Sequence, residues 1–297
     1  MHDHTSDRIV VGVDGSAPSD AAVRWAAREA AMRNVSLTLL HVVVPEVTAT
    51  GLGFTLAPLP TQHGDIAKKE GQRVLEAAKS IADAVVPSGK RVTVRSEIAF
   101  AALAPTMIAA TKDAQMIVVG CQGAGAWSRM LLGSVSTALV HHARCPVAVI
   151  HGPVEGSAHD EGPVVVGVDG SRSSESAIAI AFDEASWRSA DLVAMHAWID
   201  DTAYGVPRAL WPELRSRAEA ELAERLAGWS ERYPDVRVER RVEFDQPARH
   251  LVQSAETAQL IVVGSHGRGG FAGMLLGSVS TTVVHAVHTP TIVARHG

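Results

Sequence analysis

The sequence predicts an α/β fold of two tandem doubly wound domains, each built on a five-stranded parallel sheet. Short apolar runs such as Ile9-Val10-Val11 are typical of strands that are covered on both faces. These runs alternate with segments of helical period, which indicates β-α-β units. The whole pattern occurs twice in 297 residues, a length of about two ordinary domains.

Each half supplies its elements in the same order. In the first half an apolar run at 8–14 predicts a strand, and a helix at 17–33 follows it. The remaining expected elements alternate in the same way: strand 36–44, a loop at 45–65, helix 66–86, strand 91–97, helix 101–113, strand 115–120, helix 134–142 and strand 146–150. The second half repeats this series from 164 to 294.

A motif after the first strand shows that the halves are duplicates. Val-Gly-Val-Asp-Gly-Ser at 11–16 recurs at 166–171, an offset of 155 residues. Later motifs recur at an offset of 144, so the first half carries about eleven extra residues, most simply in the loop at 45–65. Units this long indicate domain duplication, not a solenoid. We expect domains at 1–152 and 163–297, joined by a polar linker at 153–162.

Composition narrows the class of protein. The net charge is −5 and the pI about 6.3, which argues against a nucleic-acid-binding protein. No apolar run reaches the roughly 18 residues of a membrane helix, and the first residues lack a signal-peptide pattern. The two cysteines are too few for a disulfide framework. These features predict a soluble cytoplasmic protein.

A glycine motif predicts one phosphate site in each half. Gly120 and Gly123 are followed after nine residues by Gly133-Ser134, and the same pattern begins at Gly264 in the second half. Glycine lets a backbone come close to a ligand, and the N-terminus of a helix favours an anion. The structural alternative is a plain turn whose serine caps the next helix, and the two interpretations are compatible.

An aspartate ends the first strand of each half. Asp14 and Asp169 lie where the carboxyl ends of parallel strands form a ligand crevice. They are candidates to accept hydrogen bonds from ribose or base, and the alternative is an Asx turn or helix cap. His41 and His196 keep the same offset of 155 late in the second strands.

Neither of the commonest nucleotide-binding motifs is present. The sequence has no Gly-x4-Gly-Lys-Ser/Thr, and the first strand is followed by Gly-Val-Asp-Gly-Ser where a dinucleotide fingerprint would read Gly-x-Gly-x-x-Gly. The glycine motif with nine residues before Gly-Ser, together with Val-Asp-Gly-Ser after the first strand, resembles the universal stress protein family. The resemblance covers nearly the whole chain and points to a tandem member.

The resemblance implies a strand order of 3-2-1-4-5 and binding of ATP in each half. The positions that match the family's site in the first half are Gly12, Asp14, Val42, Gly120, Cys121, Gln122, Gly123, Ala124, Gly125, Ala126, Arg129, Gly133, Ser134, Val135 and Ser136. Those in the second half are Gly167, Asp169, Ala197, Gly264, Ser265, His266, Gly267, Arg268, Gly269, Gly270, Gly277, Ser278, Val279 and Ser280. Backbone near Val42 and Ala197 would face adenine, and the Gly-Ser-Val-Ser segments would hold the phosphates.

The two loops differ in charge. Arg268 could contact a phosphate where the first half has Ala124, although Arg129 could substitute from another angle. The sites are therefore expected to differ in affinity, in a direction that the sequence leaves open.

Three functions remain open. The first is a nucleotide-dependent regulatory or signalling protein in stress or growth control, because two complete motifs stand without an evident catalytic set. The second is a slow ATPase or ATP-using transferase, in which the two aspartates could help to hold Mg²⁺. The third is an interaction module whose glycine loops serve only the fold. The last strand of each domain is a short apolar edge, and edges of this kind invite pairing. We expect these two edges to pair with each other and the chain to form a homodimer.

Overall fold

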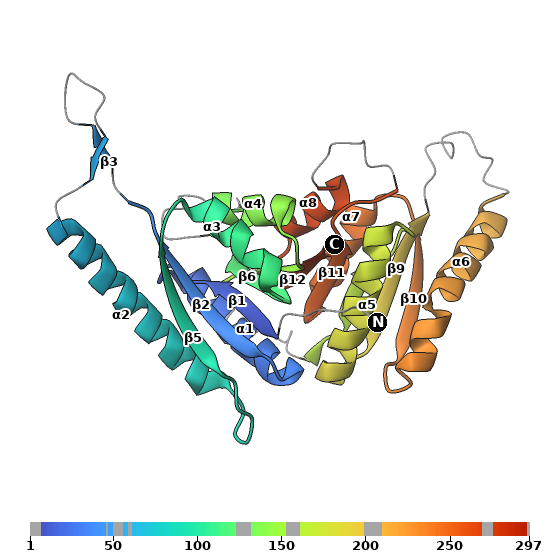
Figure 1. The fold of residues 1–297 in the computed structure, drawn as a ribbon. Helices are drawn as coiled ribbons and strands as arrows, with labels where there is room; N and C mark the ends of the chain where they lie inside the picture. Colours follow the sequence, from blue (N-terminus) through green and yellow to red (C-terminus); the bar gives the residue numbers. More distant parts are fainter. Residues whose placement is uncertain are drawn as a thin grey trace. The chain divides into compact units, whose positions relative to one another are not determined.

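The structure is a computed structural model that describes residues 7–45, 47–49, 56–58, 61–122, 132–152, 161–198, 210–268 and 276–295 (Figure 1). It divides into two compact units. The first comprises Met1–Leu139 with Ile150–Pro153, and the second comprises Val140–Val149 with Val154–Gly297. The linker expected at 153–162 lies outside the described residues except for Glu161 and Gly162.

The first unit contains a parallel sheet in the order β6-β1-β2-β5. Its strands are β1 (Arg8–Gly12), β2 (Ser36–Val43), β5 (Val94–Phe100) and β6 (Met116–Gly120). Its helices are α1 (Ala17–Arg33), α2 (Thr61–Val85), α3 (Leu103–Ala110) and the first part of α4 (Ser134–His142). Read from β5 to β6, and numbered by their order in the chain, these strands stand in the order 3-2-1-4, as the resemblance implies.

The second unit contains the whole predicted strand order, 3-2-1-4-5, as β10-β9-β8-β11-β12. Its strands are β8 (Val164–Gly167), β9 (Leu192–Trp198), β10 (Val238–Phe244), β11 (Leu260–Gly264) and β12 (Thr291–Ala294). Its helices are α5 (Arg172–Arg188), α6 (Trp211–Arg232), α7 (Pro247–Ala255) and α8 (Ser278–Ala286). The α/β fold with doubly wound parallel strands is therefore confirmed.

The last strand of the first repeat belongs to the second compact unit. β7 (Val147–Ile150) pairs antiparallel with β12, with Val149 opposite Thr291 and Val147 opposite Val293. All four residues of each strand are buried. The predicted pairing of the two apolar edges inside one chain is therefore observed.

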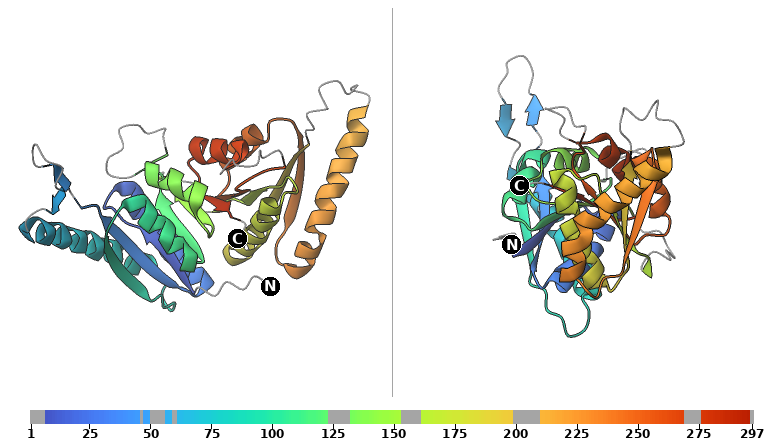
Figure 2. Two further views of the ribbon diagram at one scale, coloured as in Figure 1. Left: turned by 45° about the horizontal axis from the view of Figure 1, so that its top comes forward. Right: turned by 90° about the vertical axis from the view of Figure 1, so that its right-hand side faces the viewer.

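Helices cover both faces of each sheet (Figures 1 and 2). α1 contacts α2, α5 contacts α6, and α7 contacts α8. The central strands are buried along their length, with Ile9 and Val11 at 0 % exposure, because helices cover them from both sides. This arrangement leaves the carboxyl ends of β1, β6, β8 and β11 to carry the predicted motifs.

Some element boundaries differ from the sequence expectation. The loop expected at 45–65 contains a small antiparallel pair, β3 (Val47–Ala49) with β4 (Leu56–Pro58), and the start of α2. A two-stranded pair this short is held by backbone hydrogen bonds, which apolar periodicity does not reveal. The expected helix 101–113 ends as a separate 3₁₀ turn, Thr111–Asp113, where the Thr111 hydroxyl donates to Ile108 O at 2.7 Å.

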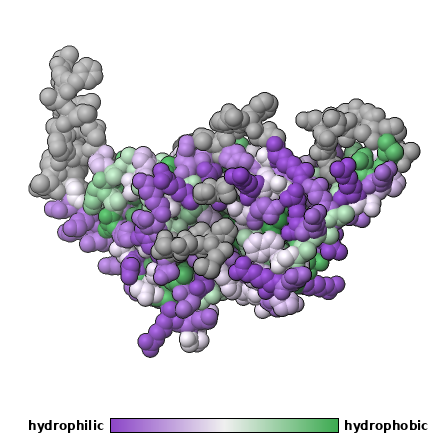
Figure 3. Space-filling model, turned by 45° about the vertical axis from the view of Figure 1, so that its right-hand side comes forward, coloured by the Kyte–Doolittle hydropathy of each residue, from purple (hydrophilic) through white to green (hydrophobic). Residues whose placement is uncertain are grey.

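One face of the molecule is mainly polar (Figure 3). Figure 3 shows a face on which hydrophilic side chains predominate and hydrophobic ones are scattered. Within the described ranges, no helix combines the length and the apolar character needed to cross a bilayer.

Candidate functional site

An Asx turn follows the central strand of each unit. Asp14 Oδ1 accepts a hydrogen bond from Ser16 N at 2.9 Å, and Asp169 Oδ1 accepts one from Ser171 N at 2.9 Å. The glycine after each aspartate has a positive φ, 79° in the first unit and 77° in the second, which glycine adopts without strain. The structural role that sequence analysis left open for the aspartates is therefore present, and both carboxylates lie at the carboxyl ends of their strands.

A histidine from the next strand fixes the peptide just before each aspartate. His41 Nδ1 lies 2.7 Å from Val13 O, and His196 Nδ1 lies 2.7 Å from Val168 O. Because a carbonyl can only accept, Nδ1 carries the proton in both rings. The sequence showed the equal spacing of these histidines but not this role in positioning the turn.

The two ends of each glycine motif are joined by a backbone hydrogen bond. Gly133 N donates to Cys121 O at 2.7 Å, and Gly277 N donates to Ser265 O at 2.8 Å. The strand end and the helix start are therefore adjacent in both units, although about ten residues separate them in sequence. This closure places the first N–H groups of α4 and α8 beside the ends of β6 and β11, as an anion site requires.

The serines of the motif join the helix starts to the strands. The buried Ser136 and Ser280 hydroxyls donate to Gly120 O and Gly264 O, and so tie each helix start to its strand. The structural alternative made Ser278 an N-cap, but Gly277 occupies that position, with φ −73° and ψ 153° and without a side-chain cap. Ser278 is therefore the first helical residue, where its N–H lacks an intrahelical acceptor.

In the second unit the aspartate and the glycine loop are in direct contact. Arg268 N donates to Asp169 Oδ2 at 3.1 Å. A Cβ built on Gly267 would lie 2.7 Å from the same Oδ2, so glycine is needed for this close approach. Gly277 adjoins the turn, because a Cβ there would lie 3.4 Å from His266 Cα and 3.5 Å from Gly267 N. Four of the predicted residues therefore lie next to one another: Asp169, Gly267, Arg268 and Gly277.

Other predicted glycines allow the helices to pack closely. A Cβ on Gly120 would lie 2.8 Å from the Pro18 carbonyl carbon, and one on Gly264 would lie 2.8 Å from that of Ser173. Neither backbone can yield, so these glycines serve the junction of strand and helix as well as any ligand.

Besides Gly120 and Gly264, four predicted residues lie on strands. Gly12 faces Met107, and Gly167 ends β8 in the equivalent place. Val42 and Ala197 lie near the carboxyl ends of β2 and β9 and are partly exposed. Their strands, β2 and β9, pair with β1 and β8, and the two aspartates follow the ends of β1 and β8.

Part of each loop cannot be compared with the expectation. The following predicted residues lie outside the described residues: Gly123, Ala124, Gly125, Ala126, Arg129, Gly269 and Gly270. Cys121 and Gln122 are described, and burial raises the pKa of the Cys121 thiol. A raised pKa disfavours the thiolate, in keeping with a thiol that has no special reactivity.

Sequence reasoning missed a cluster of charges at the mouth of the second site. Glu221 on α6 accepts hydrogen bonds from Arg268 and, at 3.1 Å, from Arg225. Arg225 also donates to Glu175 Oε1 at 2.8 Å. The bonds from Arg268 and then from Arg225 lower the pKa of Glu221. The i,i+4 spacing of Glu221 and Arg225 is visible in the sequence, but nothing in it places α6 beside the loop.

An open hollow of about 310 Å³ borders the loop of the second unit. It is lined by Ser171, Arg172, Ser173, Ser265, His266, Gly267 and Arg295. The Arg295 guanidinium donates to three carbonyls at the end of α4, those of Val140, His141 and Ala143, at 2.8 to 3.0 Å. Residues 265–267 of the glycine loop therefore belong both to the candidate site and to the lining of the hollow. The first residues of α8 do not line the hollow.

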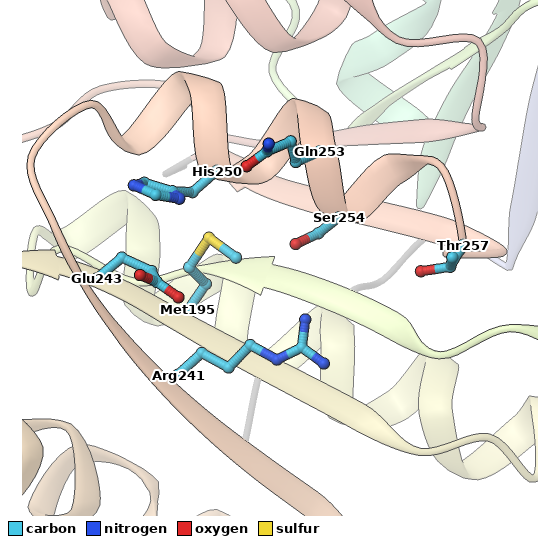
Figure 4. A pocket seen from close by; sticks show the side chains of 7 residues that line it. All are labelled: Met195, Arg241, Glu243, His250, Gln253, Ser254 and Thr257. Atoms are coloured by element: carbon cyan, nitrogen blue, oxygen red, sulfur yellow. The ribbon is translucent and has the colours of Figure 1, made fainter.

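A second hollow, of about 210 Å³, lies elsewhere in this unit (Figure 4). Its side chains come from β9, β10, α7 and the turn after α7, and none belongs to a predicted motif: Met195, Arg241, Glu243, His250, Gln253, Ser254 and Thr257. We therefore do not include it in the candidate site.

The groups in the second unit have the chemistry of a nucleotide site. The first N–H groups of α8 and the guanidinium groups of Arg225 and Arg268 suit phosphate, and the Asp169 carboxylate suits hydroxyl or amine donors. In the described parts of the chain, no three His, Cys, Asp or Glu residues gather as metal ligands would. In the first unit, the described groups of the same kinds are the Asp14 carboxylate and the first N–H groups of α4.

Comparisons with known proteins agree with this architecture. The sequence profile of the Universal stress protein family matches residues 5–151 and 162–295. Universal stress protein Rv2623 of Mycobacterium tuberculosis is 51 % identical over 288 residues, which are 97 % of this chain and 96 % of the relative. A universal stress protein of Mycolicibacterium smegmatis is 49 % identical over 288 residues, again 97 % and 96 %.

Solved structures support the fold alone. A universal stress protein from Archaeoglobus fulgidus superposes with a TM-score of 0.72 at 20 % identity, covering 98 % of this chain and 99 % of that one. Two family matches in sequence and two relatives of equal length show that the chain belongs to the universal stress protein family, as a member with two such domains in tandem.

Proposed function

We propose that the chain binds ATP at one site in each half and acts as a nucleotide-dependent regulatory or signalling protein in stress or growth control. One observation carries the proposal. In both units an Asx turn and a closed glycine motif stand at the carboxyl ends of strands, at the place where doubly wound sheets bind ligands.

Each part of the nucleotide has candidate partners. Asp14 and Asp169 accept hydrogen bonds from ribose or base, and the backbone near Val42 and Ala197 faces adenine. The N–H groups from Gly133 to Ser136 and from Gly277 to Ser280 bind the phosphates. Mg²⁺ accompanies the phosphates, because it is usually held by them together with one or two carboxylates.

The direct test is the nucleotide content of the purified protein. Denaturing extraction followed by chromatography should release an adenine nucleotide from the full chain, and less from a variant that carries both Asp14→Ala and Asp169→Ala. Protein that neither retains nor rebinds any adenine nucleotide would overturn the proposal and favour an interaction module. Turnover of ATP well above background with a defined second substrate would instead favour a transferase.

We further propose a cytoplasmic homodimer. Two cysteines in 297 residues are too few for the disulfide framework of a secreted protein, which fits a reducing compartment. The strands β5 and β10, which end the strand order of their units, carry charged residues such as Arg95 and Glu239 that discourage pairing of edges. A dimer therefore uses helix faces, and light scattering at several concentrations tests it. A monomer mass throughout would remove the dimer.

A further inference from the structure

Two guanidinium groups converge over the turn that follows Asp169. Arg225 comes from the middle of α6 and Arg268 from the glycine loop, 43 residues later in the sequence. Both donate to the same oxygen, Glu221 Oε1. A Cβ added to Gly170 would collide with the guanidinium groups of both arginines. Glycine at this position therefore provides the positive φ of the turn and also the room for two cations above it.

The first unit has the same turn, and among its described residues no cation lies above it. Gly15 has a φ of 79°, close to the 77° of Gly170. The nearest group to a Cβ on Gly15 is a methyl group of Val74, at 3.4 Å, and Val74 lies on α2, the helix that corresponds to α6. The backbone of the turn is thus equivalent in the two halves, whereas the side chain above it is apolar in one and cationic in the other.

The arginine pair is continuous with the candidate nucleotide site. The Arg268 N–H donates to Asp169, the residue proposed to bind ribose or base. Asp169 touches Gly267, and the turn at His266 and Gly267 adjoins Gly277 at the start of α8. A nucleotide that reaches from Asp169 towards α8 therefore passes beside Arg268, and its phosphate oxygens can meet the arginine pair.

The acid that now holds the arginines occupies the position of an anionic ligand. Glu221 is partly exposed, with 37 % of its side chain accessible, and its two bonds to Arg225 and Arg268 are the charge-assisted bonds that a phosphate oxygen would also accept. Exposed ion pairs of this kind contribute little to stability. Replacing the Glu221 carboxylate by a phosphate group as the partner of the two arginines therefore costs little free energy. Glu175 keeps its bond to Arg225 during the exchange.

We propose that Arg225 and Arg268 form a phosphate subsite in the second half, which has no counterpart among the described residues of the first half, and that Glu221 is its internal competitor. The inference rests on the proposed function, since it assigns these residues to the phosphates of a nucleotide bound there. The second half then distinguishes nucleotides by their phosphate groups, while the first half, with Val74 in place of the cation, depends more on the nucleoside.

Three variants of the full chain test the subsite, in an Asp14→Ala background that reports on the second half. Glu221→Gln should tighten ATP binding by about fivefold, because it removes the competing charge. Arg225→Val, which copies the first half, should weaken ATP binding by roughly tenfold. Adenosine affinity should be unchanged in both. Glu219→Gln is the matched control, because Glu219 lies on the same helix and pairs with Arg215 at 3.0 Å.

Calorimetry with ATP and with adenosine gives the outcomes. If ATP binds and Glu221→Gln behaves like Glu219→Gln, the subsite is wrong while the proposed function stands. If Arg225→Val weakens adenosine and ATP equally, Arg225 only supports the fold, and the subsite is again wrong. If the parent chain binds neither ligand in either half, the proposed function fails and the subsite fails with it.

Discussion

The turns at Gly15 and Gly170 are the same structure with different surroundings. Each follows an aspartate whose carboxylate caps the turn, and each is fixed by a histidine from the neighbouring strand. Above Gly15 lies the apolar side chain of Val74, whereas above Gly170 lie two arginines joined by Glu221. Duplication has kept the backbone frame of the site, and the charge at its mouth has diverged. The comparison therefore predicts shared binding of the nucleoside and unequal response to phosphate.

The largest effect is expected from removing the aspartates, which both halves share and which are proposed to bind the nucleoside. Asp14→Ala and Asp169→Ala should each weaken adenosine in their own half by about tenfold to a hundredfold, because a charged hydrogen-bond partner is lost. Asp169→Asn is the control, since its side-chain oxygen can still accept from Ser171 N and keep the turn. Unchanged adenosine affinity in the alanine variants would return both aspartates to a purely capping role.

Two glycines of the second half should separate folding from binding. Gly264→Ala should destabilise the protein by about 1–3 kcal/mol, because the added Cβ would overlap the Ser173 backbone. Gly277→Ala should lower the melting temperature far less than Gly264→Ala, since its φ of −73° suits alanine, the nearest atom is at 3.4 Å, and only the poorer N-capping by alanine costs stability. Gly277→Ala should still weaken the binding of ATP, because the added Cβ would crowd the phosphates.

Thermal unfolding and calorimetry on the same samples check this pair. A fall in melting temperature for Gly277→Ala as large as that for Gly264→Ala would show that the glycine is only structural.

Placing an arginine in the first half should sharpen the comparison. Val74→Arg introduces a cation above Gly15 and should raise the preference of that half for ATP over adenosine by about threefold. The measurement is the ratio of the two affinities in an Asp169→Ala background. A ratio equal to that of the parent would mean that a guanidinium on this helix does not reach the ligand.

The smallest expected effect concerns pH. Burial, followed by the charges of His142, Arg295 and His266, lowers the pKa of His141 below its ordinary 6.5. Because the folded pKa is the lower one, the contribution to stability is complete above about pH 6.5 and is lost as the pH falls through the folded value. His141→Gln should therefore flatten the decline of melting temperature on acidification.

His285→Gln, at the equivalent place on α8, serves as the control for His141→Gln. An acid profile of His141→Gln that matches the parent would show that His141 does not contribute to it.

The sequence predicted the strands and the residues at their carboxyl ends, because buried strands and glycine turns leave local patterns. The strand order was implied by the resemblance to the universal stress protein family. It could not assign Arg225 to the site, since only the packing of α6 brings that residue over Gly170. The roles of His41 and His196 were missed for the same reason, because each bond spans 28 residues. The alternative role of Ser278 as an N-cap belongs to Gly277, one residue earlier, since glycine and serine are both acceptable N-caps.

The central claim is that both halves bind ATP. Calorimetric titration of nucleotide-stripped full-length protein tests it most directly. The account predicts a stoichiometry near two per chain, falling to near one in Asp14→Ala and in Asp169→Ala. A stoichiometry near one in the parent would mean that one half has lost binding, and no binding in either half would contradict the account.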